Sequence, residues 1–192
     1  MNLNETQLRE KYKVFEGNWI HVMQEMKKDN RIPMTIKQIA ERRLNSKQQD
    51  WKDNSFESCD AVIYGEKGNF KIVKNSELLK NVTKEQIEDF QYKITKEQYE
   101  EIEGKEFGVK DKKLNEDIFK LLLEDLYEPY IKMLGYIPDV YFSDWREYQV
   151  CILWFARFGG DRSDVVGGSG YLRLGYRVHG VGVGKEFLDS GE

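Results

Sequence analysis

The stretch 155–184 constrains the fold of this chain more than any other segment. It holds nine of the 16 glycines and contains no Lys, Glu, Gln, Met or Trp, although Lys and Glu are common elsewhere. Glycine is unfavourable inside helices, and Gly-Gly and Ser-Gly pairs mark turns. We therefore expect short β strands at 171–174 and 178–183, separated by turns. The unusual composition also makes this stretch the first place to look for function.

The chain as a whole has the composition of a globular protein. Of its 192 residues, 40% are hydrophobic and 13% are aromatic, which is enough for one core or for a compact domain with a smaller unit. The formal net charge of −4 argues against nucleic acid as a partner, because phosphate binding needs a basic surface. Cys59 and Cys151 lie far apart, and we expect both to be buried and reduced.

We expect no targeting or membrane segment. Residues 1–22 are charged and helical in pattern, without the apolar run of a signal peptide. No apolar stretch approaches the length of a membrane span, so no membrane insertion is expected. We expect synthesis in the cytoplasm and leave the final site open between a virion, a cell surface and the cytoplasm.

Hydrophobic periodicity predicts helices at the N-terminal end. Residues 5–28 have apolar side chains at helical spacing, with a break at Gly17. Thr35 is predicted to be the N-cap of a helix over 36–45.

The middle of the chain contains one hairpin signal and a repeated helix-start signal. Residues 59–73 contain two short β-prone runs around a Gly-containing turn, which predicts a β hairpin. The sequence Thr-Lys-Glu-Gln occurs at 83–86 and again at 95–98, and each copy is a capping box that predicts a short helix. Gly104 is expected to end the second of these helices.

The strongest predicted helix covers 115–134, with Gly135 as its stop and a kink or break at Pro129. Residues 149–158 are apolar and aromatic, and they predict a buried strand or a helix that leads into one.

Motifs for enzymatic chemistry are weak in this sequence. Residues 180–185 end in Gly-Lys, but Glu186 stands where a nucleotide-binding loop has Ser or Thr, so no nucleotide cofactor is expected. His21 is expected to be a structural or exposed helix residue, and His179 a turn residue. No zinc-type spacing of Cys and His occurs. Four acidic residues could gather around Ca²⁺ but lack an EF-hand pattern, and no metal site is predicted: Asp139, Asp144, Asp161 and Asp164.

Arginines and aromatic residues alternate in the glycine-rich stretch. These residues are Arg157, Phe158, Arg162, Tyr171, Arg173, Tyr176 and Arg177. Arginine and aromatic side chains can stack on nucleic-acid bases, but together with Ser and Gly they are also typical of protein-recognition surfaces. The acidic net charge favours protein recognition.

The stretch 155–184 resembles the variable region of proteins diversified by diversity-generating retroelements. Such proteins have an aromatic-rich lead-in to the variable region, which here ends in 156–160, and a last strand near the end of the chain, which here would be 180–183. In that family, adenines of asparagine-type template codons are randomised, and such codons cannot yield Lys, Glu, Gln, Met or Trp. Several spaced residues look like a fixed frame similar to that of archaeal or archaeal-virus-like members: Arg162, Ser163, Gly167, Leu172, Arg177 and Val178.

The resemblance implies a fold and a binding surface. The fold is a C-type lectin fold of the formylglycine-generating-enzyme subtype, a single α+β domain over 1–192 with N-terminal helices packed on a small mixed or antiparallel sheet. The region 155–184 then carries the ligand-binding surface, above a scaffold that buries Trp145, Trp154 and Phe155. We predict nine ligand-binding residues between the frame positions: Asp161, Asp164, Val166, Gly168, Ser169, Tyr171, Arg173, Leu174 and Tyr176.

The chain departs from related proteins in ways that limit the inference. It lacks the Glu-Pro-Asn or Trp-Asn-Asp calcium signatures of sugar-binding C-type lectins and the cysteine pair of formylglycine-generating enzymes. We therefore predict no catalytic residue, metal or cofactor, and an unidentified protein or surface as the ligand rather than a nucleic acid. Two alternatives stay open, an enzyme of unknown class with a glycine-rich cleft near His179 and a nucleic-acid or phage-structural module. A half-buried glycine-rich β region also tends to exclude Lys and Glu.

Overall fold

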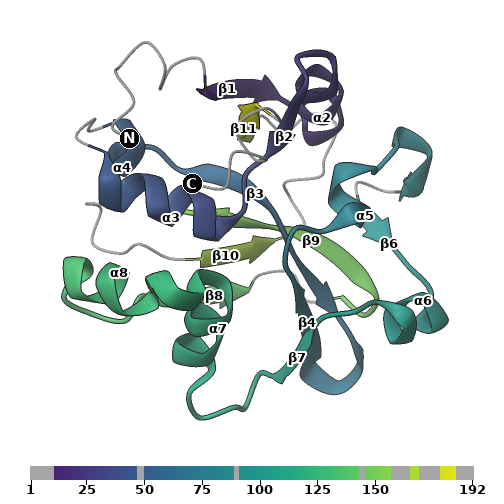
Figure 1. Cartoon of the computed structure of the whole chain (residues 1–192). Coiled ribbons are helices and arrows are strands. Elements are labelled where there is room, and N and C mark those ends of the chain that lie inside the picture. Colours follow the sequence, from purple (N-terminus) through teal and green to yellow (C-terminus); the bar gives the residue numbers. More distant parts are fainter. Residues whose placement is uncertain are drawn as a thin grey trace.

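The chain folds into helices around a mixed β-sheet, as the α+β prediction requires (Figure 1). The computed structural model describes residues 11–46, 50–88, 91–142, 146–156, 165–168 and 178–184. The strands within these ranges are β1 Tyr12–Gly17, β2 Arg31–Pro33, β3 Phe56–Tyr64, β4 Asn69–Val73, β5 Ile87–Glu88, β6 Gln91–Lys93, β7 Lys105–Gly108, β8 Val140–Phe142, β9 Gln149–Phe155, β10 Val165–Gly168 and β11 Val178–Gly184. The helices are α2 Trp19–Lys28, α3 Ile36–Asn45, α4 Asp50–Asp53, α5 Glu77–Lys80, α6 Lys96–Glu101, α7 Leu114–Leu123 and α8 Tyr127–Leu134. Short 3₁₀ helices cover Glu66–Gly68, Lys84–Gln86 and Glu124–Leu126.

The sheet joins segments from both ends of the chain. Its main path runs β1-β11-β3-β9-β10-β8, so β11 lies between β1, to which it is antiparallel, and β3, to which it is parallel. The hairpin of β3 and β4 forms as predicted, and β7 pairs with β4. The strand alternative is confirmed for β9, and β11 confirms the strand expected over 178–183. The strand expected over 171–174 lies outside the described residues.

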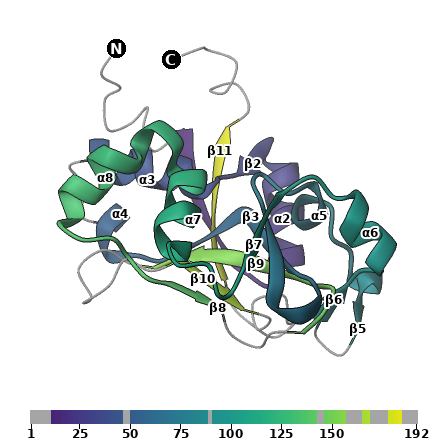
Figure 2. The same ribbon diagram turned by 90° about the horizontal axis from the view of Figure 1, so that it is seen from below.

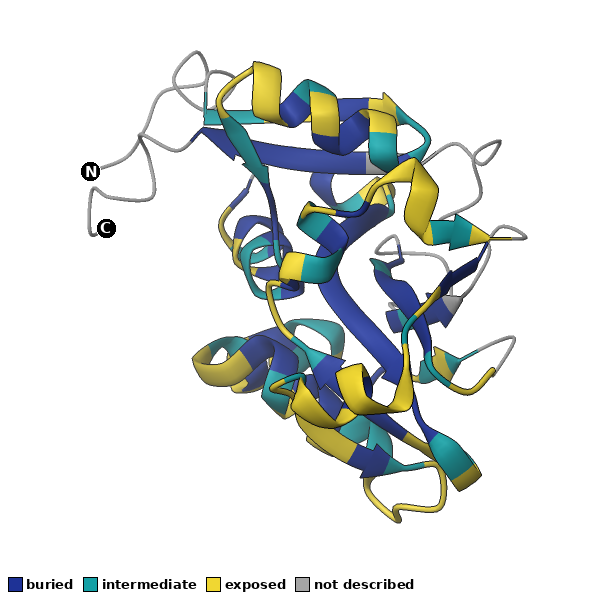
Figure 3. Cartoon of the chain, turned by 90° about the vertical axis from the view of Figure 1, so that its right-hand side faces the viewer, coloured by how far each residue is buried: buried dark blue, intermediate teal, exposed yellow. Residues whose placement is uncertain are grey.

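Two hydrophobic cores lie on opposite faces of the sheet, because side chains alternate along each strand. The larger core joins α3, α7 and α8 to Cys151, Leu153 and Phe155 of β9. The smaller core joins α2 to Val150 and Ile152 of the same strand. The helices accordingly form two groups, α3, α4, α7 and α8 on one side and α2, α5 and α6 on the other (Figure 2). Buried residues run through the strands, and exposed residues lie on the outer faces of the helices (Figure 3).

The helix predicted over 5–28 is wrong in part. Tyr12–Gly17 forms β1, because this segment pairs along its whole length with β11, a contact that local periodicity does not reveal. The helix begins only at Trp19, after Asn18, whose side-chain oxygen accepts the backbone N–H of His21. Residues 5–10 lie outside the described part of the chain.

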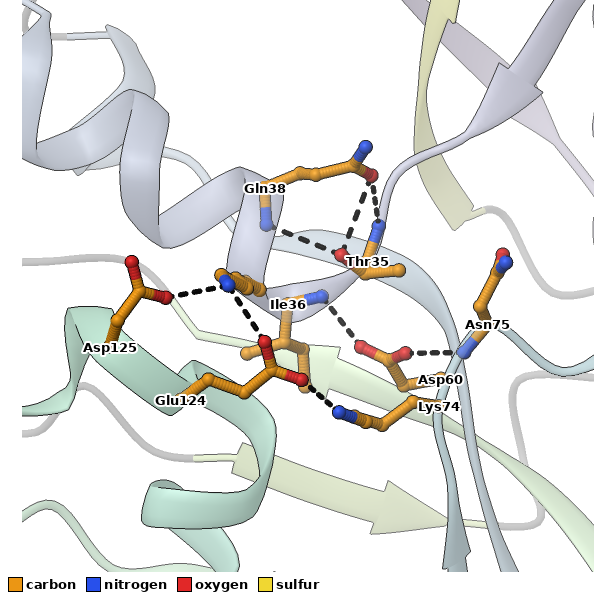
Figure 4. A network of polar contacts seen from close by, with 9 residues as sticks. Thr35, Ile36, Gln38, Asp60, Lys74, Asn75, Glu124 and Asp125 are labelled. Atoms are coloured by element: carbon orange, nitrogen blue, oxygen red, sulfur yellow. Dashed lines mark hydrogen bonds and ion pairs between the residues drawn. The ribbon is translucent and has the colours of Figure 1, made fainter. Parts of the chain in front are cut away.

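A polar network fastens the start of α3 (Figure 4). The capping box predicted at Thr35 is confirmed, with Gln38 as its second member. The buried carboxylate of Asp60 accepts the backbone N–H of Ile36 at 2.6 Å and that of Asn75 at 2.8 Å. Burial raises the pKa of Asp60 to about 6, although these two N–H donors and nearby Lys74 act in the opposite direction.

The predicted helix over 115–134 breaks earlier than expected. The break lies at Glu124, whose φ is 53°, rather than at Pro129. Pro129 is the third residue of α8, in the first turn, where a backbone N–H has no intrahelical partner and proline is tolerated. Glu124 bonds to Lys37 of α3 and to Lys74, which directly follows β4, so the junction of α7 and α8 is tied to both segments (Figure 4). Gly135 ends α8 with a φ of 81°, as predicted.

The structure also tests the predictions for the repeated capping box, the two cysteines and membrane-spanning helices. Both Thr-Lys-Glu-Gln boxes form, the first opening a 3₁₀ turn and the second opening α6. Helix α6 ends at Glu101, with Ile102 as its C-cap, rather than at Gly104. Cys59 and Cys151 are buried and neither forms a disulfide, as expected. Among the described helices, none is long and apolar enough to cross a bilayer.

Candidate functional site

Two of the nine predicted ligand-binding residues lie in the described part of the chain. Val166 and Gly168 belong to β10, which pairs with β9 on one side and β8 on the other. The other seven predicted residues fall outside the described ranges: Asp161, Asp164, Ser169, Tyr171, Arg173, Leu174 and Tyr176. The structure describes the strands that border these segments: β9, β10 and β11.

Val166 belongs to a row of cross-strand neighbours that crosses the main sheet. Paired residues of adjacent strands carry their side chains on the same face. The row consists of Phe15, Gly180, Glu57, Trp154, Val166 and Tyr141, in the order β1-β11-β3-β9-β10-β8. We call the last three of these residues, Trp154, Val166 and Tyr141, the row end.

Exposure increases along this row toward β8. Phe15 and Gly180 are buried against α2, whereas Trp154 and Val166 are partly exposed and Tyr141 is 61% exposed. At the row end, two aromatic rings and one aliphatic side chain are therefore partly or largely exposed. Aromatic side chains with partial exposure are the usual anchors of protein interfaces.

The neighbours of Val166 along β10 face the opposite way and are locked by packing. Val165 is fully buried in the larger core. A Cβ on Gly167 would lie 2.6 Å from Val62 Cγ1 and 2.8 Å from Phe142 Cδ1, and the Tyr64 hydroxyl donates to the Gly167 carbonyl at 3.2 Å. The packing around Gly167 therefore excludes any larger residue at this position, whereas the partly exposed side chain of Val166 is not restricted in this way.

Lack of space for a side chain also explains part of the glycine enrichment in 155–184. A Cβ on Gly180 would lie 2.7 Å from Val22 Cγ1, and one on Gly182 would lie 3.1 Å from an aromatic carbon of Phe15. These glycines let α2 and β1 approach β11 closely. Because 180–184 is a strand inside the sheet, it is not a phosphate-binding loop before a helix.

A buried arginine supports the end of β9, where the chain enters the predicted variable segment. The Arg43 guanidinium donates to the carbonyls of Trp51 at 2.9 Å and Phe155 at 3.4 Å, and to the Tyr130 hydroxyl at 3.2 Å. It also lies 4.2 Å from the centre of the Phe155 ring. Arg43 was not predicted as important. Its signal in the sequence is a charged residue four positions after Ile39, on the apolar face of the helix.

The expectation that Trp154 is a buried scaffold residue is wrong. Strand alternation puts Trp154 on the same face as Val166, where it is partly exposed, whereas Phe155 on the opposite face is fully buried as predicted. Trp145 lies outside the described residues.

The structure describes several of the residues that the sequence offered for chemistry. His179 lies in β11 opposite Glu16 rather than at a turn, and His21 is exposed on α2. Burial raises the pKa of the Cys59 thiol well above its usual range, which keeps it protonated and unreactive. Within the described ranges, no three Cys, His, Asp or Glu side chains are placed to hold a metal ion. Of the four aspartates considered for Ca²⁺, only Asp139 is described.

A solved structure shows which fold this is. No protein-family model and no curated protein matches the sequence. The solved chain is one in which the C-type lectin fold accommodates massive sequence variation in Nanoarchaeota; it matches with a TM-score of 0.59 at 12% identity, covering 91% of this chain and 99% of that chain. This chain has the C-type lectin fold. Within this C-type lectin fold, the row end lies on β9, β10 and β8, and the predicted variable segments connect to the ends of β9, β10 and β11.

Proposed function

We propose that this protein is a ligand-binding protein whose stretch 155–184 forms a hypervariable surface diversified by a retroelement. Its ligand is a protein or another exposed surface, and the surface sits on one C-type lectin-like domain of the formylglycine-generating-enzyme subtype. The protein is accordingly archaeal or comes from an archaeal virus.

The observation that carries this proposal is that neighbouring residues of β10 face opposite sides of the sheet. Val165 and Gly167 are fixed by the larger core, while Val166 lies on the other face, beside the partly exposed Trp154 of β9. Such alternation lets the residue at 166 change without loss of packing in the larger core. The similar fold that accommodates massive sequence variation in Nanoarchaeota supports the same use of the fold here.

The surface combines constant and variable contacts. Trp154 and Tyr141 precede the stretch 155–184 and supply the same aromatic contacts in every variant. Tyr171, Arg173 and Tyr176 add contacts that differ between variants. Rigid aromatic side chains bind with little loss of conformational entropy, which suits a surface that must meet many ligands.

The DNA around the gene tests this proposal directly. We expect a near-copy of the codons for 155–184 close by, together with a reverse transcriptase gene. The copies should differ mainly where the template carries adenine, with differences at the codon for Val166 and none at the codons for Val165 and Gly167. A locus without a second copy and without a reverse transcriptase gene would contradict diversification and leave only a glycine-rich β region.

A further inference from the structure

Two neighbouring arginines of α3 differ in their hydrogen bonds. The Arg43 guanidinium donates to three backbone carbonyls and to the Tyr130 hydroxyl. Arg42 is only 8% exposed, yet it makes no hydrogen bond to any residue that the structure describes. A buried charge without an acceptor or a counter-charge is destabilising, so Arg42 calls for an explanation.

The outer edge of the Arg42 guanidinium is accessible. Its Nε is fully buried without a partner, but its two Nη groups are not among the fully buried unpartnered atoms of the described chain. The Nη groups therefore reach the surface, and they have no acceptor among the described residues. A ligand that approaches this edge can accept hydrogen bonds from both of them.

Two aromatic rings hold the guanidinium in place. It lies 5.2 Å from the centre of the Tyr12 ring and 5.4 Å from that of Trp51, which belongs to the neighbouring helix α4 (Figure 1). The two rings contact each other edge to face, with their centres 5.3 Å apart. Aromatic rings attract a guanidinium but do not replace an oxygen acceptor. The rings therefore position Arg42 and leave its donors available.

Tyr12 adds a second donor. Its side chain is half-buried, and its hydroxyl bonds to no residue in the described part of the chain. Burial raises the pKa of Tyr12, although nearby Arg42 acts in the opposite direction, so the hydroxyl stays protonated at neutral pH. A protonated hydroxyl can donate to the same ligand as the guanidinium.

The charges around these donors select a singly charged anion. A carboxylate matches the planar guanidinium because its two oxygens accept from two N–H groups at once. The carboxylate of Glu41 already lies close enough to raise the pKa of Tyr12. A doubly charged phosphate would meet this negative charge with only one guanidinium to balance it. A carboxylate is therefore the better match.

We propose that Arg42 binds a carboxylate group from outside the chain, with the Tyr12 hydroxyl as a second donor. The site lies on the opposite face of the sheet from the row end. Tyr12 packs against the larger core, whereas Phe15, at the other end of the row that contains Trp154, belongs to the smaller core. The site is therefore independent of the proposed recognition surface.

NMR titration of the full chain tests the site. The reporters are the Nε–H signal of Arg42, whose buried proton is protected from water, and the indole N–H signal of Trp51. Sodium acetate, a glutamate with blocked ends, inorganic phosphate and sodium chloride are compared at equal ionic strength. We expect saturable, millimolar binding of at least one carboxylate and none of chloride. Tighter binding of acetate assigns a small free acid, and tighter binding of the blocked glutamate assigns an acidic side chain of a protein.

The variant Arg42→Met removes the charge and keeps an apolar side chain between the rings. It should bind about ten-fold more weakly or less, because it loses a charge-assisted bond. It should also have a higher melting temperature without ligand, because an uncompensated buried charge is gone. The matched control is Lys13→Met, which removes the same charge from an exposed residue next to Tyr12 on the opposite face of β1. This control should bind as the parent does.

Two further variants keep the test valid if Arg42→Met does not fold. Arg42→Lys keeps the charge but loses the planar pair of donors, and Tyr12→Phe keeps the ring but loses the hydroxyl. Both should fold, and each should weaken binding several-fold. No response to either carboxylate, an equal response to chloride, tighter binding of phosphate than of both carboxylates, or binding that survives the substitutions at Arg42 and Tyr12 would overturn the proposal.

Discussion

Single residues in β10 differ sharply in how far the fold restricts them. Gly167 has no space for a Cβ, while the side chain of Val166, its neighbour, is partly exposed. At the residue scale, this contrast is the most direct link between the core and the proposed binding surface.

Substitutions at these two positions should have opposite outcomes. Gly167→Ala should lower the free energy of unfolding by about 2 kcal/mol, because the new methyl group overlaps Val62 and Phe142. Val166→Ala is the matched control and should change it by less than about 1 kcal/mol. Urea denaturation of the three proteins measures both values. Equal losses at the two positions would show that β10 does not separate core residues from surface residues.

At the scale of elements, the network around the start of α3 makes two carboxyl groups respond to pH in opposite directions. Asp60 is buried and has a raised pKa, whereas the pKa of Glu124 is lowered to about 2 by its bonds to Lys37 and Lys74. Both groups lie at the contacts that join α3 to the rest of the molecule.

The pH dependence of unfolding should show both effects. Because the pKa of Asp60 is higher in the folded state, its contribution to the free energy of unfolding falls as pH rises from about 4 to about 6. Because the pKa of Glu124 is lower in the folded state, its contribution falls as pH drops from about 4.5 toward 2. Denaturant melts between pH 2 and pH 7 should show that Asp60→Asn flattens the upper window and Glu124→Gln the lower one. A larger change in the other window than in its own, by either variant, would contradict the assignment.

Local signals predicted these elements better than long-range ones did. The capping boxes at Thr35, Thr83 and Thr95 were correct because all of their partners lie within three residues. The strand Tyr12–Gly17 was mistaken for helix because its hydrogen bonds come from β11. The break at Glu124 was missed because Lys37 and Lys74, which hold it, are distant in sequence.

The candidate site was predictable to a similar degree. The composition of 155–184 predicts the binding stretch, and this stays a prediction; of its residues, Val166 lies on a partly exposed face. The roles of Trp154 and Arg43 could not be read from the sequence in the same way. They depend on which face of β9 meets which core, and that is decided by the packing of α3 and α8.

At the scale of the whole molecule, the sheet depends on its strand β11, which lies near the end of the chain. Strand β11 pairs with β1, β2 and β3, and its Gly180 and Gly182 allow side chains of α2 and β1 to pack closely against it. Contacts between such distant parts of a chain also slow folding, since much loop entropy is lost before they form.

A chain that ends at Arg177 should therefore fail to fold, whereas one that ends at Gly184 should fold. The shorter chain lacks β11, so β1 loses its strand partner, and Val22 and Met26 of α2 lose the backbone of Gly180 against which they pack. Circular dichroism melts and size-exclusion chromatography compare the two. A cooperative melt from the shorter chain would disprove the requirement for β11.

The place of β11 after the proposed variable segments has a genetic consequence. A frameshift or stop codon that arises between β10 and β11 removes the strand to which β1 and β3 bind, so the product cannot complete its sheet. Cells degrade proteins that stay unfolded. Only copies of the gene that keep their reading frame through the diversified codons would therefore give a lasting protein, and folding itself would remove defective variants before they meet a ligand.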